Sequence, residues 1–350
     1  MNTQRGEGTE RGTEGAPLRD KFKFAMYWAG SCGGCEIALL EIKDKIIEVD
    51  QNYEVVFWPA AADFKYKDVE GYDDGFIDVC LFNGCIRNSE NEHLAKLLRQ
   101  KSKVLVAFGA CAVMGGIPGL ANVADAAEIK ELVYIDSPSI DNPDGVYPQE
   151  RYEVPEGELE LPHMYDTVKT LDQTVDVDYY VPGCAPEAHQ IAAVLDVVTA
   201  ALKGEGPLPP KGATVGVSPK TCCDECERVK EEKKISGFKR IWEFLPDPEK
   251  CLLEQGLICM GPATRAGCGA RCTGVGMPCR GCYGAPEGVI DQGAKMLSTV
   301  ASIVDAPTPE EIAVIAATVP DPVGTFYRFG LASSLMRRAK VTEAKSEVPV

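Results

Sequence analysis

Residues 22–49 read FKFAMYWAGSCGGCEIALLEIKDKIIEV, and this stretch decides the fold of the first half of the chain. Phe22 to Trp28 form an apolar run rich in aromatic residues, which is typical of a buried strand. Glu36 to Val49 carry apolar residues at helical spacing and predict one helix. The apolar positions of this helix are Ile37, Leu40, Ile46 and Ile47. Cys32 and Cys35 lie in the glycine-rich loop between strand and helix.

The same alternation of strand and helix continues along the chain. Further strands are predicted at Tyr53 to Trp58, Ile77 to Phe82, Lys103 to Phe108 and Val177 to Val181. Further helices are predicted at Ser89 to Gln100 and Pro186 to Leu202. Such alternation favours an α/β fold with a doubly wound, flavodoxin-like parallel sheet and right-handed crossovers. A cysteine-rich, loop-dominated domain follows this sheet.

We expect five segments along the chain. Residues 1–21 form a disordered tail, 22–203 the flavodoxin-like domain, 204–220 a linker, 221–330 the cysteine-rich domain and 331–350 a C-terminal tail. The linker is placed by the density of Gly and Pro between Lys203 and Lys220. Ser137 to Thr174, with several prolines and acidic residues, is expected to form an excursion at the surface of the first domain.

Composition excludes several kinds of partner. The 350 residues carry a net charge of −17, which argues against binding to nucleic acid or to an anionic membrane. No apolar run approaches the roughly 18 to 20 residues that a membrane span needs. With no export signal, the chain is expected in the cytoplasm. An odd number of cysteines in a reducing compartment disfavours disulfides and favours bound metal.

Nine of the fifteen cysteines fall within residues 222–282, a stretch too short to build a large apolar core. They are Cys222, Cys223, Cys226, Cys251, Cys259, Cys268, Cys272, Cys279 and Cys282. Thiolates at these spacings are typical of iron–sulfur clusters or zinc, and disulfides are the remaining option. Because the whole chain has only three histidines, zinc is the weaker of the two metal hypotheses.

Four other cysteines follow predicted strands at one edge of the sheet. Cys32 and Cys35 follow the first strand, Cys111 the fourth and Cys184 the fifth. Ligands of open parallel sheets bind at the carboxyl ends of the strands, so these four thiols predict one iron–sulfur site.

Two more residues of the same edge could also supply ligands to this site. Asp63 follows the second strand and offers an oxygen ligand, and Cys85 follows the third strand and offers sulfur. Cys80 lies inside a predicted strand and is interpreted as core packing.

These motifs resemble the small, electron-transferring subunit of nickel–iron hydrogenases. The resemblance rests on Cys-x2-Cys at Cys32 and Cys35, Gly-Ala-Cys-Ala-Val-Met-Gly-Gly around Cys111 and Pro-Gly-Cys-Ala-Pro around Cys184. It covers residues 22–330. Trp58-Pro59 to Asp63-Phe64-Lys65, with Cys251 to Cys272, resembles the cytoplasmic group found in methanogens. The first site then corresponds to the family's proximal cluster.

The resemblance also implies how the later cysteines divide into two further [4Fe–4S] clusters. Cys223, Cys226, Cys251 and Cys259 form the distal set. Cys268, Cys272, Cys279 and Cys282 form the medial set. Cys222 is left over, or replaces Cys223. Arg265, Arg271 and Arg280 lie among the thiols and could offset the negative charge of reduced clusters.

The resemblance implies an electron-transfer subunit that itself neither forms nor breaks covalent bonds in a substrate. Electrons from dihydrogen would pass from a nickel–iron large subunit through three [4Fe–4S] clusters to an acceptor. In the family that acceptor is heterodisulfide reductase, reached through an iron–sulfur adaptor, or a deazaflavin coenzyme. The alternatives are a stand-alone polyferredoxin, the quinone-proximal subunit of a respiratory complex, and a zinc-bound scaffold. Spaced cysteines at the first site, instead of adjacent ones, count against the respiratory subunit.

Overall fold

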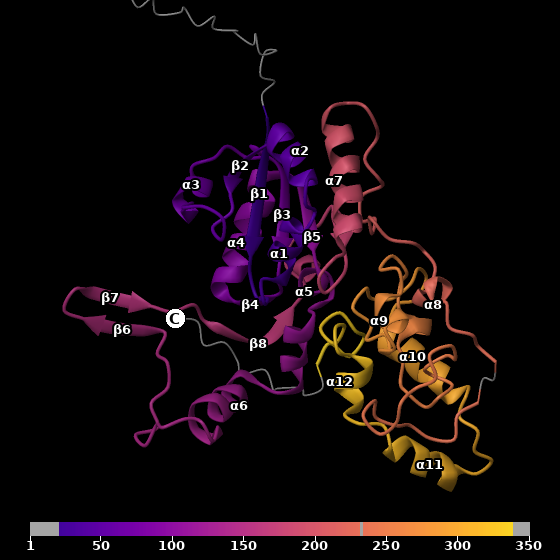
Figure 1. Cartoon of the computed structure of the whole chain (residues 1–350). Coiled ribbons are helices and arrows are strands. Elements are labelled where there is room, and N and C mark those ends of the chain that lie inside the picture. Colours follow the sequence, from indigo (N-terminus) through magenta and orange to yellow (C-terminus); the bar gives the residue numbers. More distant parts are fainter. Residues whose placement is uncertain (1–20, 232–233, 339–350) are drawn as a thin grey trace, which may run out of the picture.

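Five parallel strands form the central sheet of the first half of the chain (Figure 1). They are β1 (Phe22–Trp28), β2 (Tyr53–Phe57), β3 (Ile77–Asn83), β5 (Ser102–Phe108) and β9 (Tyr179–Val181). Their order across the sheet is β2-β1-β3-β5-β9, which is the flavodoxin-like order. The predicted strands and the α/β fold class are therefore confirmed. The computed structural model describes residues 21–231 and 234–338, so most of the predicted N-terminal tail and the end of the C-terminal tail lie outside the described residues.

The helix predicted from Glu36 to Val49 is wrong in two respects. It is divided into α1 (Gly34–Leu40) and α2 (Lys45–Asn52), and Lys43 between them adopts a left-handed backbone with φ of 57°. The buried apolar positions are Cys35, Ala38, Leu39 and Ile42, whereas Ile37 and Leu40 are 62% and 57% exposed. These four residues follow helical spacing, but none of them was among the apolar positions predicted from the sequence.

Helices cover both faces of the sheet. The predicted helices are confirmed as α4 (Ser89–Lys101) and α7 (Ala188–Leu202), and α3 (Tyr66–Glu70) and α5 (Ala110–Met114) are added. Alternate strand residues point to opposite faces. Phe24 and Val106 pack with α1 and α7 on one face, whereas Phe82 and Leu105 pack with α4 on the other. Cys80 is fully buried in the second of these cores, which confirms its packing role.

An arm extends from the first domain between α5 and β9 (Figure 1). It starts with η1 (Ile117–Val123), α6 (Ala126–Glu131) and the π-helical segment η2 (Leu132–Asp136), and continues into a hairpin of β6 (Arg151–Val154) and β7 (Gly157–Glu160). The chain returns through β8 (Met164–Lys169), which pairs with β4 (Ile86–Asn88), and through η3 (Leu171–Gln173). The predicted surface excursion thus contains a hairpin and a returning strand.

Membrane-spanning potential is limited to one bent pair of segments. Within residues 21–231 and 234–338, no single helix has the length and apolar character to cross a bilayer. Ala110–Val123 and Ala126–Asp136 together have sufficient length and composition, but they are bent by 77° relative to each other.

The segment predicted as a linker runs along the free edge of β9. The backbone N–H of Tyr180 donates to the Ala213 carbonyl at 3.1 Å, and the N–H of Val215 donates to the Tyr180 carbonyl at 2.9 Å. These bonds satisfy backbone groups of the edge strand that would otherwise face solvent.

Short helices and long loops make up the second half. The helices are α8 (Cys222–Glu225), η4 (Gly261–Ala263), α9 (Arg271–Gly274), α10 (Gln292–Ala301), α11 (Pro309–Ala317) and α12 (Pro322–Phe326). One apolar core joins all of these helices except α9, and it includes the buried cysteines Cys222, Cys259 and Cys279 together with Met296 and Phe326. The predicted loop-dominated, cysteine-rich character is confirmed, and sulfur forms part of the core.

Residues 331–338 pack back against the first domain. Gln173 Nε2 donates to the Ala332 carbonyl at 2.9 Å, and Arg338 Nη1 donates to Thr167 Oγ1 at 2.7 Å. The amide of Asn122 is fully buried and donates to the carbonyls of Val168 at 3.0 Å and Arg337 at 2.8 Å. The start of the predicted C-terminal tail therefore connects the two halves of the molecule.

Replacing Asn122 by alanine should lower the free energy of unfolding by roughly 1–3 kcal/mol, because it leaves buried backbone groups of Val168 without hydrogen-bond partners. Chemical denaturation followed by circular dichroism measures the change. Asn142→Ala is the matched control, since Asn142 also makes three backbone hydrogen bonds, but at the exposed arm. Equal losses in the two variants would contradict a special role for the buried amide.

Candidate functional site

Four cysteine side chains meet at the carboxyl end of the sheet. Cys32 and Cys35 follow β1, Cys111 lies in α5 after β5, and Cys184 follows β9. Burial raises the pKa of Cys35, and the thiols of Cys111, Cys184 and Cys32 raise it further. Burial likewise raises the pKa of Cys111 to about 12. The structure thus brings together the four thiols predicted for the first site.

Glycine backbone borders the sulfur atoms of this proximal group. A Cβ on Gly109 would overlap Cys35 Sγ, and a Cβ on Gly116 would lie 2.6 Å from Cys111 Sγ. Both glycines have positive φ angles, 85° and 59°. The Gly34 N–H donates to Cys32 Sγ at 3.4 Å. Four thiols and a side-chain-free backbone around them fit a sulfide-containing cluster, which needs room and N–H donors beside its sulfur atoms.

The two alternative ligands of this edge have different surroundings. Asp63 is exposed and forms an ion pair with Lys65, and it is not among the groups whose charges act on Cys35 or Cys111. Cys85 is fully buried, and its thiol donates to the Gly30 carbonyl at 3.0 Å. Because its charge raises the pKa of Cys111, Cys85 lies beside the proximal group as a fifth thiol.

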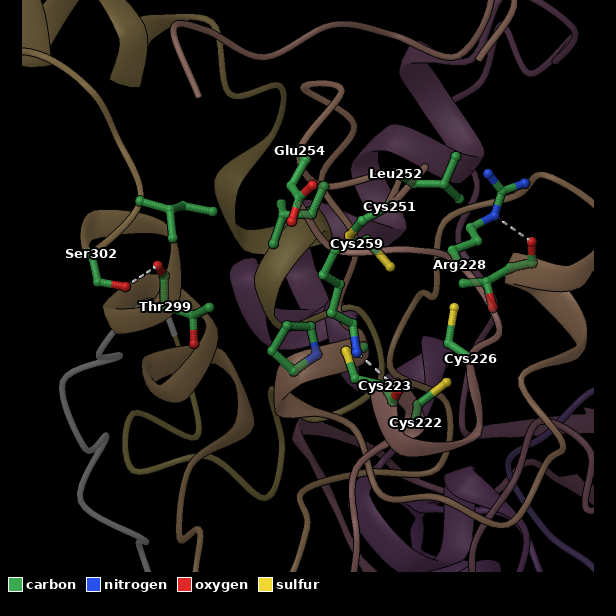
Figure 2. A pocket seen from close by; sticks show the side chains of 16 residues that line it. Cys222, Cys223, Cys226, Arg228, Cys251, Leu252, Glu254, Cys259, Thr299 and Ser302 are labelled. Carbon is green, nitrogen blue, oxygen red and sulfur yellow. Dashed lines mark hydrogen bonds between the residues drawn. The ribbon is translucent and has the colours of Figure 1, made fainter. Parts of the chain in front are cut away.

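The second half contains a cavity of about 300 Å³ whose lining includes five cysteines. Figure 2 shows the side chains of Cys223, Cys226, Cys251 and Cys259, the predicted distal set, around one space. Burial raises the pKa of Cys223 to about 11, against the opposing charge of Lys230. A cavity lined by four thiols from three segments of the chain fits the predicted cluster in ligand type.

Two cationic side chains hold the loops around this cavity. Arg228 Nε donates to the Thr273 carbonyl at 2.8 Å, and Arg228 Nη1 donates to the carbonyls of Asp247 at 2.8 Å and Lys250 at 3.0 Å. Lys230 Nζ donates to the Cys223 carbonyl at 3.0 Å. Both side chains line the cavity and place positive charge beside thiols that would be negative when they bind metal.

The predicted medial set lies between the proximal and distal groups. Burial raises the pKa of Cys282 and the Cys279 thiol raises it further; the backbone and thiol of Cys184 also act on this pKa, so Cys282 lies close to Cys184. On the other side, the Cys279 N–H donates to Cys259 Sγ at 3.3 Å. Cys272 is exposed as a residue, but its thiol is partly buried; this burial raises its pKa, and the thiols of Cys279 and Cys268 raise it further.

Cys222 has a position that its place in the sequence did not predict. Its side chain is 2% exposed and interacts with the thiols of Cys268 and Cys279, and it also lines the distal cavity. Contact with Cys222 lowers the pKa of Cys268 to about 6. Successive residues of a helix point about 100° apart, so Cys222 and Cys223 at the start of α8 face different groups. This helical geometry was the signal that could have separated the two cysteines from sequence alone. Both had been predicted only for the distal group.

The thiol groups described above differ from a compact site for a single metal ion. Among the residues that the structure describes, no group of three or more His, Cys, Asp or Glu side chains is arranged to hold one metal ion.

Comparison with known proteins identifies the family. Residues 32–198 match the family model described as NADH ubiquinone oxidoreductase, 20 Kd subunit. The chain is 43% identical to the iron–sulfur subunit of the F420-non-reducing hydrogenase of Archaeoglobus profundus, over 81% of this chain and 88% of that protein. It is 38% identical to the corresponding F420-non-reducing hydrogenase subunit of Methanothermobacter marburgensis, over 91% and 97%. The chain belongs to the family of F420-non-reducing hydrogenase iron–sulfur subunits.

This membership confirms the predicted hydrogenase resemblance. A further relative, a vhu subunit of the F420-non-reducing hydrogenase of Methanocaldococcus jannaschii, is 40% identical over 90% of this chain and 97% of its own length. The family model covers only the sheet domain, whereas these relatives extend over both halves. The protein is therefore a subunit of an oxidoreductase complex.

Replacing Gly109 by alanine should remove the proximal cluster, because the new Cβ would overlap Cys35 Sγ. We expect iron per chain to fall by about four, the content of one cubane. Iron analysis of the anaerobically purified protein measures this. Gly204→Ala is the control, since Gly204 has a similar φ of 75° with no atom near its Cβ position. It should cost about 1–2 kcal/mol of stability and no iron. Full iron in Gly109→Ala would contradict the proposed position of the cluster.

Proposed function

We propose that the protein is the electron-transfer subunit of a nickel–iron hydrogenase and that it carries electrons from dihydrogen oxidation through three [4Fe–4S] clusters. The observation that supports this most directly is the succession of three thiol groups, each in contact with the next. Cys184 of the proximal group lies against Cys282 of the medial group. Cys279 of the medial group donates its N–H to Cys259 of the distal group.

Each cluster has a proposed set of four ligands. The proximal set is Cys32, Cys35, Cys111 and Cys184; the medial set is Cys268, Cys272, Cys279 and Cys282; the distal set is Cys223, Cys226, Cys251 and Cys259. Asp63 is left out of the proximal set because its carboxylate is exposed and paired with Lys65. Bound clusters would supply one-electron carriers. Electron transfer slows steeply with distance, so contact between neighbouring ligand sets favours rapid passage.

The chain's own groups would set the properties of these carriers. Backbone N–H groups of Gly34 and Cys279 donate to ligand sulfurs, and such bonds stabilise the reduced, more negative state. Burial of Cys35, Cys259 and Cys279 excludes water from one side of each group. Potentials are therefore expected to differ among the three sites, because solvent exposure and N–H bonding differ at each.

The proximal edge is the proposed face for the nickel-containing large subunit. Cys32 and Cys184 are exposed at this edge. Trp28, Ile37 and Leu40 are also exposed, and all three lie within a few residues of Cys32 or Cys35. Apolar and aromatic side chains gathered at the surface are typical of protein interfaces. A partner docked here would cover these side chains and the proximal cluster together.

The acceptor is proposed from the family resemblance. We favour heterodisulfide reductase, reached through an iron–sulfur adaptor subunit, because the relatives are named F420-non-reducing hydrogenases. Reduction of the deazaflavin coenzyme is the weaker alternative for the same reason. A stand-alone polyferredoxin is also weaker, since a free carrier needs no exposed apolar edge beside its first cluster. The cytoplasmic location stays a prediction.

Metal analysis of the purified chain tests the proposal. Three cubanes require about twelve iron and twelve acid-labile sulfide per polypeptide. The protein must be purified anaerobically, with zinc measured on the same sample. Zinc without sulfide would overturn the proposal and support the scaffold alternative. Iron near four or eight would retain electron transfer but contradict the three-cluster assignment.

Variants of Cys272 and Cys222 test the fourth ligand of the medial cluster. We expect Cys272→Ala to lose about one iron and to give a three-iron signal in electron paramagnetic resonance, because a cubane that lacks one thiolate releases the unligated iron. Cys222→Ala should keep full iron, because its thiol only contacts the ligands Cys268 and Cys279. The reverse result would assign Cys222 as the ligand and Cys272 as the additional thiol.

A further inference from the structure

Four cationic side chains gather around one small pocket of the second half. Lys239, Arg240, Arg280 and Arg328 line a cavity of about 100 Å³. The charges of Arg328 and Arg240 act on Arg280, so the guanidinium groups are close enough to repel one another. In residues 21–231 and 234–338, none of the four forms an ion pair with a carboxylate. In a chain with a net charge of −17, such a concentration of positive charge is unusual. We refer to these four residues as the basic pocket.

A loop with exposed aromatic and apolar side chains borders the basic pocket. Residues 236–248 contain no helix or strand. Trp242 and Leu245 of this loop are 72% and 94% exposed. The Arg240 guanidinium lies 4.7 Å from the centre of the Trp242 ring, which orients both side chains at the rim. Tryptophan and arginine are both enriched among energetically dominant interface residues.

The basic pocket lies next to the medial and distal thiols. Arg280 is the neighbour of Cys279 in the chain, and the charges of Cys259 and Cys279 act on it. Ile258, which precedes Cys259, also lines the pocket. A molecule bound here would therefore contact residues that adjoin Cys259 and Cys279, proposed ligands of the distal and medial clusters.

Size and charge select among possible occupants. Pockets for small molecules and cofactors are typically about 300–1,000 Å³, so this cavity admits a side chain more readily than a flavin or a nucleotide. The planar guanidinium groups of Arg280 and Arg328 suit a carboxylate. A polyanion such as nucleic acid would be repelled by the rest of the chain. A protein with a local acidic patch would be attracted to the four cationic side chains of this pocket.

We propose that the basic pocket and the loop of residues 236–248 form the docking site of an acidic electron-accepting protein, one of whose carboxylates enters among Arg240, Arg280 and Arg328. This inference rests on the proposed electron-transfer function. Trp242 and Leu245 would pack against the apolar part of the acceptor surface. The charges would orient the acceptor with its redox centre toward the distal and medial clusters.

Hydrogen-dependent reduction of two acceptors by the purified hydrogenase complex tests the inference. The protein acceptor is an acidic [2Fe–2S] ferredoxin, and the small cationic acceptor is methyl viologen. The variants are Lys239→Glu combined with Arg240→Glu, Trp242→Ala, and the control Lys203→Glu, which changes an exposed lysine outside the pocket. We expect the charge-reversed pair to raise the KM for ferredoxin about tenfold at low salt, with a smaller difference at high salt. Trp242→Ala should raise it at both salt concentrations.

The control and the small acceptor separate docking from electron transfer itself. Lys203→Glu should leave the KM for ferredoxin unchanged, and all variants should reduce methyl viologen at the wild-type rate with full iron content. Equal KM values for the charge-reversed pair and the control would overturn the docking site. A wild-type complex that reduces methyl viologen and not ferredoxin would also overturn it. Failure of the wild-type complex to reduce methyl viologen under hydrogen would instead contradict the proposed function.

Discussion

Negative charge on neighbouring buried sulfur is the constraint on which the rest of the structure depends. Thiols that lie together away from water resist ionisation, and burial with neighbouring sulfur raises the pKa values of Cys35, Cys111 and Cys282. Metal ions reverse this cost, because a bound cation stabilises the thiolate. The gathering of so many thiols in three places therefore supports the proposal that the chain binds iron–sulfur clusters there. Backbone N–H groups and nearby cations supply the remaining compensation.

The two halves meet this constraint in different ways. In the first half, a rigid parallel sheet with helices on both faces holds the loops, and glycines at positions 109 and 116 let backbone approach the sulfurs. The second half has short helices and a core that includes cysteine side chains. Part of its folding free energy is therefore expected to come from cluster binding, as in other small metal-binding domains. The first half has an apolar core of its own on each face of the sheet.

The two halves are also joined so that the thiol groups stay in contact. Two side chains of the first domain bind carbonyls near the end of the described chain. Asn122 donates to the Arg337 carbonyl, and Gln173 donates to the Ala332 carbonyl. Glu187, which precedes α7, forms an ion pair with Arg271 beside Cys272 at 3.0 Å. Its backbone N–H donates to the Tyr283 hydroxyl at 3.1 Å, next to Cys282. Proximal and medial groups are thus held together by polar contacts near the Cys184 and Cys282 pair.

The sequence by itself determined the five strands, the α/β class and the family, and it predicted that most cysteines divide into three groups. Local apolar periodicity and the motifs around the cysteines are sufficient for these, because neighbours in sequence share one strand or one loop. Tertiary structure alone decided the break between α1 and α2 and the exposure of Ile37 and Leu40, since burial depends on what packs against a helix. It also decided that Cys222 contacts the medial thiols while Cys223 faces the distal cavity, and it brought Lys239, Arg240, Arg280 and Arg328 together. Those contacts join residues from different parts of the chain, so they form only when the loops of the second half fold together.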